Sequence, residues 1–210
     1  MYPEKVKIQR HLQKMERKER NRMKQMNSYI DSVFSNEDDL LEEVVSSISG
    51  AKHVLEIGAL GGDSGICLAR GFGKEGTLTS LELKKEYAEL AHSNLTKAGF
   101  GGQVTYMTGA ALQSLEQLVK SDKRFDFFFI DADKGNYEQY LTHCIELAKP
   151  GAVIVADNVL AGGSVADQKA APRRHTEVMR TFNKTVAQHP QLESLLIPIG
   201  DGMTVSKVKK

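Results

Sequence analysis

Oxygen-bearing side chains follow two predicted strands of this sequence. Asp131 comes directly after the apolar run 125–130, and Asp157 and Asn158 come directly after the run 152–156. Because the carboxyl ends of parallel strands meet at one edge of a sheet, we expect these three side chains to share a crevice. Their oxygens suit an octahedral Mg²⁺, or another divalent cation such as Mn²⁺ or Ca²⁺. The pattern therefore predicts a metal site, and the alternative is that the acids only cap helices.

A glycine-rich turn follows the predicted strand 53–57. The turn reads Glu56-Ile-Gly-Ala-Leu-Gly-Gly-Asp-Ser64, and its glycines permit a tight bend and a close approach of a ligand to the backbone. A nicotinamide-dinucleotide fingerprint would need glycine where Leu60 stands. Glu82 ends the next predicted strand, where it could accept hydrogen bonds from both hydroxyls of a ribose. Two acids beside the turn oppose a polyphosphate and tolerate a cationic ligand, which favours S-adenosylmethionine.

Strands and helices alternate along most of the chain. Strands are predicted at 53–57, 77–82, 104–107, 125–130 and 152–156, and helices at about 64–71, 84–98, 112–120, 135–148 and 173–188. Nearly unbroken apolar strands separated by helices indicate an α/β fold, a parallel sheet with helices on both faces. The runs 195–199 and 203–208, joined by Gly-Asp-Gly, predict a terminal hairpin that adds an antiparallel strand.

The composition predicts one domain with an appendage. The chain has 210 residues, 40% of them hydrophobic and 26% charged, which is typical of a soluble globular protein. We expect a basic amphipathic helical appendage at 1–34 and the main domain at 35–210, where a first helix would start after Ser35 and end at Gly50. The apolar positions with near-helical spacing in the appendage are Ile8, Leu12, Met15, Met23, Met26, Ile30 and Val33.

The appendage is strongly basic. Residues 1–25 carry nine Lys and Arg against three Glu. Its apolar stripe favours packing on the main domain or on a second subunit. The alternative is an arm that binds the phosphates of RNA.

Apolar runs, histidines and cysteines exclude some classes of protein. The longest apolar runs fall far short of the ~20 residues that cross a bilayer, and the N-terminus lacks the apolar stretch of a signal peptide, so we expect a cytoplasmic protein without a membrane partner. The His residues are scattered, so no zinc site is expected. Cys67 and Cys144 each lie in an apolar helical pattern, which predicts two buried free thiols.

Four motifs carry a family resemblance. They are Leu55-Glu-Ile-Gly58, Phe129-Ile-Asp-Ala-Asp-Lys134 with Tyr137 and Tyr140, Asp157-Asn158 with Gly163-Ser-Val165, and Pro198-Ile-Gly-Asp-Gly202. Over about residues 30–208 the chain resembles the cation-dependent class I O-methyltransferases of the caffeoyl-CoA and catechol O-methyltransferase type. This resemblance implies a Rossmann-like methyltransferase fold with strand order 3-2-1-4-5-7-6, and a homodimer.

The same resemblance implies roles for individual residues. The residues that would contact S-adenosylmethionine are Glu56, Gly58, Ala59 and Ser64 at its methionine part, Glu82 at its ribose, Ala111 beside its adenine, and Asp131, Asp133 and Tyr140. Asp131 would also bind the metal together with Asp157 and Asn158, and Lys134 would be the general base. Two positions depart from the family pattern: Asp63 replaces an aromatic residue, and Gly162 stands where plant enzymes have a substrate-contacting Asn.

The predicted function is a divalent-metal-dependent O-methyltransferase. It would move the methyl group of S-adenosylmethionine to a hydroxyl of a small catechol-like or hydroxycinnamoyl acceptor. An alternative keeps this chemistry but takes tRNA as partner, methylating a hydroxylated wobble uridine, with the basic arm and Lys207, Lys209 and Lys210 following phosphates. A third reading is a non-catalytic cofactor-binding module.

Overall fold

The computed structural model describes residues 50–72, 74–167 and 174–209. The predicted appendage, its boundary with the main domain and the predicted helix after Ser35 lie outside these residues. The strands are β1 (His53–Ile57), β2 (Thr77–Glu82), β3 (Val104–Thr108), β4 (Phe125–Ile130), β5 (Ala148–Asp157), β6 (Leu192–Ile197) and β7 (Met203–Val208). The helices are α3 (Asp63–Phe72), α4 (Lys85–Lys97), α5 (Ala111–Lys120), α6 (Tyr137–Leu147) and α7 (Thr176–Gln188), with short 3-10 helices η1 (Gly101–Gln103), η2 (Lys134–Asn136) and η3 (Ala161–Ala166).

These strands form one seven-stranded sheet in the order β3-β2-β1-β4-β5-β7-β6. β1 pairs in parallel with β2 and β4, β2 pairs in parallel with β3, and β4 with β5. Only β7 runs against its neighbours, since it pairs antiparallel with both β5 and β6. The strand order that the family resemblance implies is confirmed.

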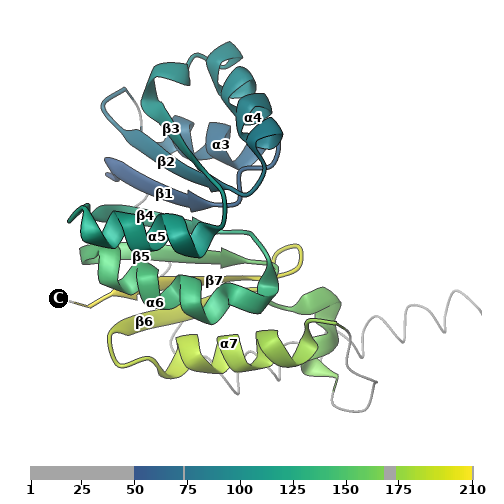
Figure 1. The fold of residues 1–210 in the computed structure, drawn as a ribbon. Coiled ribbons are helices and arrows are strands. Elements are labelled where there is room, and N and C mark those ends of the chain that lie inside the picture. The colour runs from purple at the N-terminus through teal and green to yellow at the C-terminus, as the bar shows by residue number, and fades with distance from the viewer. Residues whose placement is uncertain (1–49, 73, 168–173, 210) are drawn as a thin grey trace, which may run out of the picture.

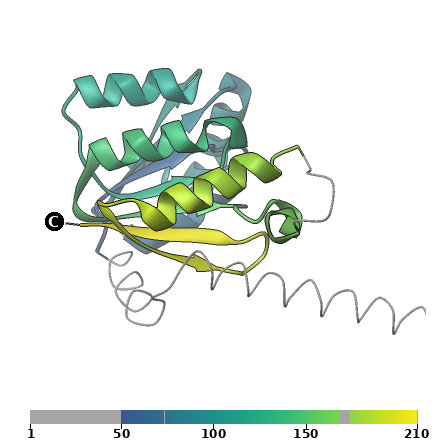
Figure 2. The ribbon, with the colours of Figure 1, turned by 90° about the horizontal axis from the view of Figure 1, so that it is seen from below.

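Helices cover both faces of the sheet (Figures 1 and 2). On one face α5, α6 and α7 pack on a core whose largest members include Phe128, Tyr137 and Phe182. On the other face α3 and α4 pack over β2 and β3, and their apolar core includes Phe72 and Leu95. β1, β4 and the second half of β5 are buried on both sides, and their sequences are the nearly continuous apolar runs that predicted them.

The element boundaries differ from prediction in a few places. β6 runs over Leu192–Ile197 and not over the predicted 195–199: it starts three residues earlier, and it ends before Pro198, which has no N–H with which to continue the ladder. β5 starts at Ala148 through an irregular pairing with Phe125 that the apolar pattern does not reveal. α6 begins at Tyr137, since the preceding residues form the tighter turn η2.

The two cysteines have different environments. Cys144 is buried, as predicted, and burial raises the pKa of its thiol. Cys67 is exposed, so the prediction of a second buried thiol is wrong. Its helix α3 faces the core through Gly65, Ala69 and Phe72, which leaves position 67 on the solvent side. None of the helices in the described part of the chain is long and apolar enough to cross a membrane.

Candidate active site

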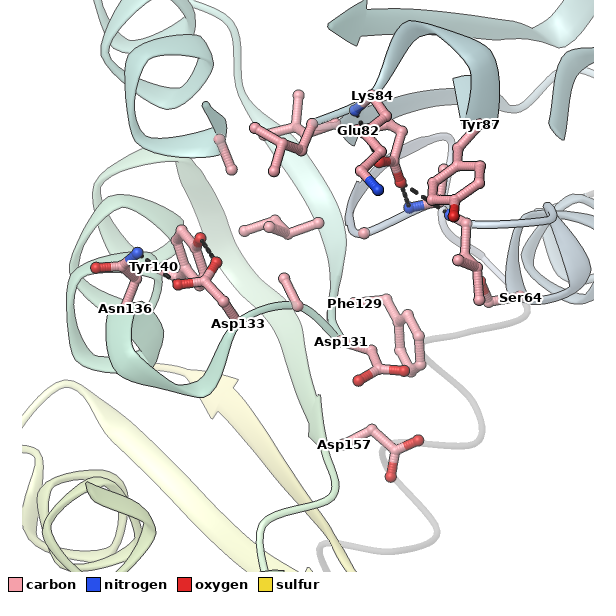
Figure 3. A pocket seen from close by; sticks show the side chains of 18 of the residues that line it. Ser64, Glu82, Lys84, Tyr87, Phe129, Asp131, Asp133, Asn136, Tyr140 and Asp157 are labelled. Carbon is pink, nitrogen blue, oxygen red and sulfur yellow. Dashed lines mark hydrogen bonds between the residues drawn. The ribbon is translucent and has the colours of Figure 1, made fainter. Parts of the chain in front are cut away.

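A cavity of about 810 Å³ lies where β1, β2, β4 and β5 end. The predicted site residues that line it are Gly58, Ala59, Ser64, Glu82, Ala111, Asp131, Asp133, Tyr140 and Asp157. Glu56, Lys134 and Asn158 are not among the lining residues. Figure 3 shows Glu82 and Ser64 on one side of the cavity, Tyr140 and Asp133 on another, and Asp131 and Asp157 near one another. The carboxyl edge of the sheet therefore gathers most of the predicted site.

The turn after β1 is pressed against the end of β4. Gly58 has φ of +101°, and a Cβ built on it would lie 2.1 Å from the backbone oxygen of Asp131. Backbone hydrogen bonds from Gly58 N to Leu81 O (2.9 Å) and from Asp131 N to Ile57 O (3.0 Å) hold this arrangement. Only glycine combines this φ with so close an approach. The turn thus places Asp131 directly beside the glycine-rich segment.

Glu82, the last residue of β2, stabilises the turn after β1 through hydrogen bonds. Its Oε2 accepts hydrogen bonds from the amides of Ala59 (3.2 Å) and Leu60 (2.9 Å), and its Oε1 accepts one from the amide of Lys84 (3.0 Å). The φ of Leu60 is 45°, which is unusual for a residue other than glycine, and the hydrogen bond to Glu82 stabilises this conformation. A carboxylate offers about four acceptor sites, and three amides already occupy three of those of Glu82. About one site is left for the predicted hydrogen bonds from a ribose.

Glu56 lies beneath the cavity rather than on its wall. The residue is fully buried, and its two oxygens accept hydrogen bonds from Ser64 Oγ (2.6 Å) and Ser80 Oγ (2.5 Å). Burial raises the pKa of this carboxyl; the two serine hydroxyls oppose the rise, and the charges of Glu82 and Asp131 add to it. Glu56 therefore reaches the cavity through Ser64, which lines it.

Lys134 forms hydrogen bonds with all three residues that are predicted to bind the metal. Its Nζ donates to Asp131 Oδ1 (3.0 Å), to Asn158 Oδ1 (3.1 Å) and to the backbone oxygen of Asp157 (3.1 Å). It also donates to the hydroxyl of Tyr137, which is fully buried. The structure thus brings the predicted base to side-chain oxygens of Asp131 and Asn158, whereas Asp157 contacts it through the backbone and uses Oδ1 to accept from Asn158 N at 2.6 Å.

The loop after β5 is held from two sides. Asn158 has φ of 58°, a left-handed conformation that asparagine tolerates better than most residues. The β6–β7 loop accepts hydrogen bonds from Val159 N (3.0 Å, to Gly202 O) and Leu160 N (2.9 Å, to Asp201 O). From α7, Asn183 Nδ2 donates to Val159 O (3.0 Å). These contacts fix the backbone that presents Asn158.

The two departures from the family pattern have structural consequences. Gly162 has φ of 63°, and its amide donates to Asp201 Oδ1 at 2.6 Å, so this position turns the backbone toward the β6–β7 loop. Asp63 lines the cavity at the start of α3, where an acid is favourable near the helix N-terminus.

A separate hydrogen-bonded group borders the cavity at α6. Tyr140 Oη donates to Asp133 Oδ1 (2.5 Å), and Asn136 Nδ2 donates to Asp133 Oδ2 (2.6 Å) (Figure 3). Burial and the bond to Asp133 raise the pKa of Tyr140, and burial likewise raises that of Tyr137, so both phenols stay protonated hydrogen-bond donors. Asp133 and Tyr140 therefore form one rigid unit of the wall.

Sequence reasoning missed several lining residues. They are Leu60, Gly61, Leu83, Lys84, Tyr87, Ala110, Leu112, Phe129, Ala132 and Asn136, beside Ile57 and Leu81. Most of them follow a strand directly or lie in the first turn of the next helix. That position was the available signal, since most of these residues are apolar or glycine and only Lys84, Tyr87 and Asn136 have polar side chains.

The chain shares sequence and fold with known proteins. A sequence model of the family described as "O-methyltransferase" matches residues 5–209. Catechol O-methyltransferase of Niastella koreensis is 35% identical over 184 residues, which cover 85% of this chain and 82% of that protein. This chain belongs to the O-methyltransferase family.

Further relatives show the extent of the family likeness. Caffeoyl-CoA O-methyltransferase 1 of Eucalyptus globulus is 37% identical over 75% of this chain and 67% of that protein. The match to rice tricin synthase 2 spans only 61% of that protein's length. The crystal structure of the O-methyltransferase TomG from Streptomyces achromogenes, in complex with SAM, has a TM-score of 0.72 and 34% identity, over 81% of this chain and 78% of that one.

The donor set of this family member is compatible with a hard cation. The described residues contain no group of three or more His, Cys, Asp and Glu that could hold a metal ion, and the cluster here has two aspartates and an asparagine instead. Yet four oxygens, from Asp131, Asn158, the Asp157 backbone and Tyr137, surround the ammonium group of Lys134. An ammonium has three protons, so this oxygen cluster offers more acceptors than it can satisfy. Oxygen-rich clusters of this kind suit Mg²⁺, Mn²⁺ or Ca²⁺.

Proposed function

We propose that this chain is a divalent-metal-dependent O-methyltransferase. It would transfer the methyl group of S-adenosylmethionine to a hydroxyl of a small catechol-like or hydroxycinnamoyl acceptor. The observation that carries the proposal is the oxygen cluster around Lys134 Nζ, placed beside a cavity that the glycine turn borders. The names of the catechol and caffeoyl-CoA O-methyltransferases among its relatives support the acceptor class.

The cofactor would occupy the part of the cavity near β1 and β2. Gly58, Ala59 and Ser64 would hold its methionine part, with Glu56 orienting Ser64 from below. Glu82 would accept from the ribose, and Ala111 would border the adenine. Asp133 and Tyr140 would contact the cofactor from α6. A sulfonium is cationic, and the acids Glu82, Asp131 and Asp133 give this wall a complementary charge.

The acceptor would bind beside Asp131, Asp157 and Asn158. A divalent cation held by these residues would lower the pKa of the acceptor hydroxyl. Lys134, in its amine form, is placed to take the hydroxyl proton. The acceptor oxygen then forms its bond to the methyl carbon as the carbon–sulfur bond breaks, giving a methyl ether and S-adenosylhomocysteine. Alignment of the two reactants by the cavity wall would supply much of the rate.

Methyl transfer from labelled S-adenosylmethionine tests the proposal. The acceptors are a catechol and hydroxycinnamoyl panel and, in parallel, bulk bacterial tRNA, each with Mg²⁺ and with EDTA. We expect label on a catechol-type acceptor that EDTA abolishes. Label only on tRNA would move the substrate assignment to RNA, whereas cofactor binding without transfer to either would contradict the proposed acceptor and agree with a binding module.

The structure adds an observation on the tRNA alternative. Lys207 pairs with Val153, midway along β5, because β7 runs antiparallel to β5. Lys209 follows β7 and donates to Pro190 O at 3.1 Å. Neither lysine lines the cavity, and Lys209 lies beyond the end of β7 that is farther from Asp157. Lys210 and residues 1–25 lie outside the described residues. A phosphate-tracking role for Lys207 and Lys209 next to the site is not supported.

A further inference from the structure

Lys134 contacts the same oxygens that the proposed function assigns to the divalent cation. We propose that Lys134 and the cation compete for Asp131 Oδ1 and Asn158 Oδ1, and that Tyr137 is the positioning residue that retains Lys134 when the cation takes them. Lys134 would thereby set the metal affinity of the site as well as taking a proton. This inference rests on the proposed metal site.

The competition follows from distance and charge. Nζ of Lys134 lies 3.0 Å from Asp131 Oδ1 and 3.1 Å from Asn158 Oδ1, so it holds both side-chain oxygens by charge-assisted hydrogen bonds. A cation on those oxygens would displace two of these bonds and stand close to the ammonium group. Like charges at such a separation repel strongly in a partly buried site. The side chain of Lys134 is only 15% exposed, so water screens this repulsion poorly.

Tyr137 offers Lys134 a contact that the cation does not remove. Its hydroxyl accepts from Nζ, and its own proton can go to Asp157 O at 3.0 Å or to Ile130 O at 3.3 Å. The ring is fully buried and packs edge-on against Phe182, with centroids 5.2 Å apart, so the hydroxyl has a fixed position. Asp157 O, also 3.1 Å from Nζ, lies on the same side. Lys134 therefore keeps two acceptors after the side-chain oxygens of Asp131 and Asn158 are taken.

Mn²⁺ affinity of the full chain is the direct test, read from the electron paramagnetic resonance of free Mn²⁺. Lys134→Met keeps the length of the side chain but removes the competing charge, so we expect about tenfold tighter Mn²⁺ binding. Tyr137→Phe removes the hydroxyl that accepts from Lys134 Nζ. Lys134 should then stay longer on the oxygens of Asp131 and Asn158, so Mn²⁺ should bind about threefold more weakly. In the double variant, the Tyr137→Phe change should have no further effect on Mn²⁺ affinity.

The double variant separates positioning from a purely structural role. If Tyr137 only braced the ends of β4 and β5, Tyr137→Phe would weaken Mn²⁺ binding equally with Lys134 and with Met at position 134. A matched control is Tyr106→Phe, since the Tyr106 hydroxyl on β3 is buried without a hydrogen-bond partner and outside the cavity. It should leave Mn²⁺ affinity unchanged. Circular dichroism of each variant verifies that it is folded.

Thermal unfolding provides a second readout. In EDTA, Lys134→Met should melt below the wild type, because Asp131 loses its cationic partner; in excess Mn²⁺ the order should reverse. Unchanged or weaker Mn²⁺ binding by Lys134→Met would overturn the competition, and equal Tyr137→Phe effects in both backgrounds would overturn the positioning role. If the wild type bound no Mn²⁺, the proposed metal dependence would fail together with this inference. If the wild type bound Mn²⁺, either of the two results just named would overturn its part of this inference and leave the proposed metal dependence standing.

Discussion

Three carboxylates at the two edges of the sheet, Asp126 at one and Glu56 and Glu82 at the other, have different kinds of partner. At the amino edge, Asp126 Oδ2 accepts from the amides of Lys52 (3.1 Å) and His53 (2.8 Å), and Oδ1 lies 2.9 Å from Lys149 Nζ. At the carboxyl edge, Glu56 has serine hydroxyls as partners and Glu82 has only backbone amides. Asp126 is thus paired with a cation, as Asp131 is with Lys134, whereas Glu56 and Glu82 accept hydrogen bonds from hydroxyls and amides instead.

This difference appears in the pKa values. Burial disfavours the charged form of Asp126, but hydrogen bonds from Lys149, His53 and Lys52 outweigh it and hold the pKa of this carboxyl below its usual value. Burial raises the pKa of Glu56, and no cation compensates. Asp126 therefore favours the folded chain, while an ionised Glu56 opposes it. Negative charge that costs stability is retained at the edge where a cationic cofactor is proposed to bind.

Lys134→Ala should have the largest effect on activity. Loss of a general base typically slows a reaction by about 10²–10⁴-fold, so kcat should fall by about a thousandfold. The measurement is methyl transfer at saturating cofactor and Mg²⁺. Lys97→Ala, a change to an exposed lysine on α4, is the control and should keep wild-type kcat. A Lys134→Ala enzyme with nearly normal kcat would show that the carboxyl edge does not use this lysine as a base.

Gly58→Ala should have the largest effect on folding. A Cβ at this position would meet Asp131 O at 2.1 Å with φ at +101°, so either the turn or the end of β4 must move. We expect a loss of about 3 kcal/mol in the free energy of unfolding, measured in urea. Gly102→Ala is the matched control, because a Cβ there meets nothing within 4 Å. Equal effects of the two changes would contradict the tight packing of turn and strand.

The sequence predicted secondary structure best where both faces of a strand are buried. Apolar runs predicted the order of elements, and the acids at the ends of β4 and β5 predicted which residues would lie together, because parallel strands end at one edge. Hairpin chemistry predicted β6 and β7, although β6 starts earlier than expected, at Leu192, and ends before Pro198. The domain boundary at 34/35, the homodimer and the cytoplasmic location remain predictions.

Side-chain direction was not available from the same patterns. The sequence did not indicate that the Glu56 side chain would point toward Ser64 and Ser80, which places it beneath the cavity and not in its wall. Cys67 lies in an apolar stretch but faces solvent, since periodicity places a helix face only approximately. The contacts of Lys134 depend on the relative placement of η2 and β5, which is a tertiary property.

Glu56→Gln should separate function from stability. The folded-state pKa of Glu56 is raised, so ionisation opposes folding as the pH rises from the ordinary value of 4.5 through the raised value. Glutamine cannot ionise, and the serine hydroxyls can rotate to suit it. The variant should therefore unfold at a higher temperature than the wild type at pH 8, and this advantage should vanish toward pH 4.5.

The same variant should bind the cofactor more weakly. Removal of one negative charge beneath Ser64 should raise the dissociation constant for S-adenosylmethionine about tenfold, as calorimetry would measure. Ser80→Ala removes the other hydroxyl partner but keeps the charge, so it should weaken cofactor binding less. Wild-type affinity in Glu56→Gln would mean that the buried charge has no part in cofactor binding.

Asp126→Asn should give the smallest effect, confined to stability. The folded-state pKa of Asp126 is lowered, so its contribution is present above the ordinary value of 3.8 and is lost as the pH falls through the lower folded-state value. At pH 7 the variant should lose about 1 kcal/mol in the free energy of unfolding, since the ion pair is partly exposed. Its kcat and its Mn²⁺ affinity should equal those of the wild type, because no residue at the amino edge touches the cavity. A changed Mn²⁺ affinity would show that strain at one end of β4 reaches Asp131 at the other, and the two edges could then no longer be treated as independent.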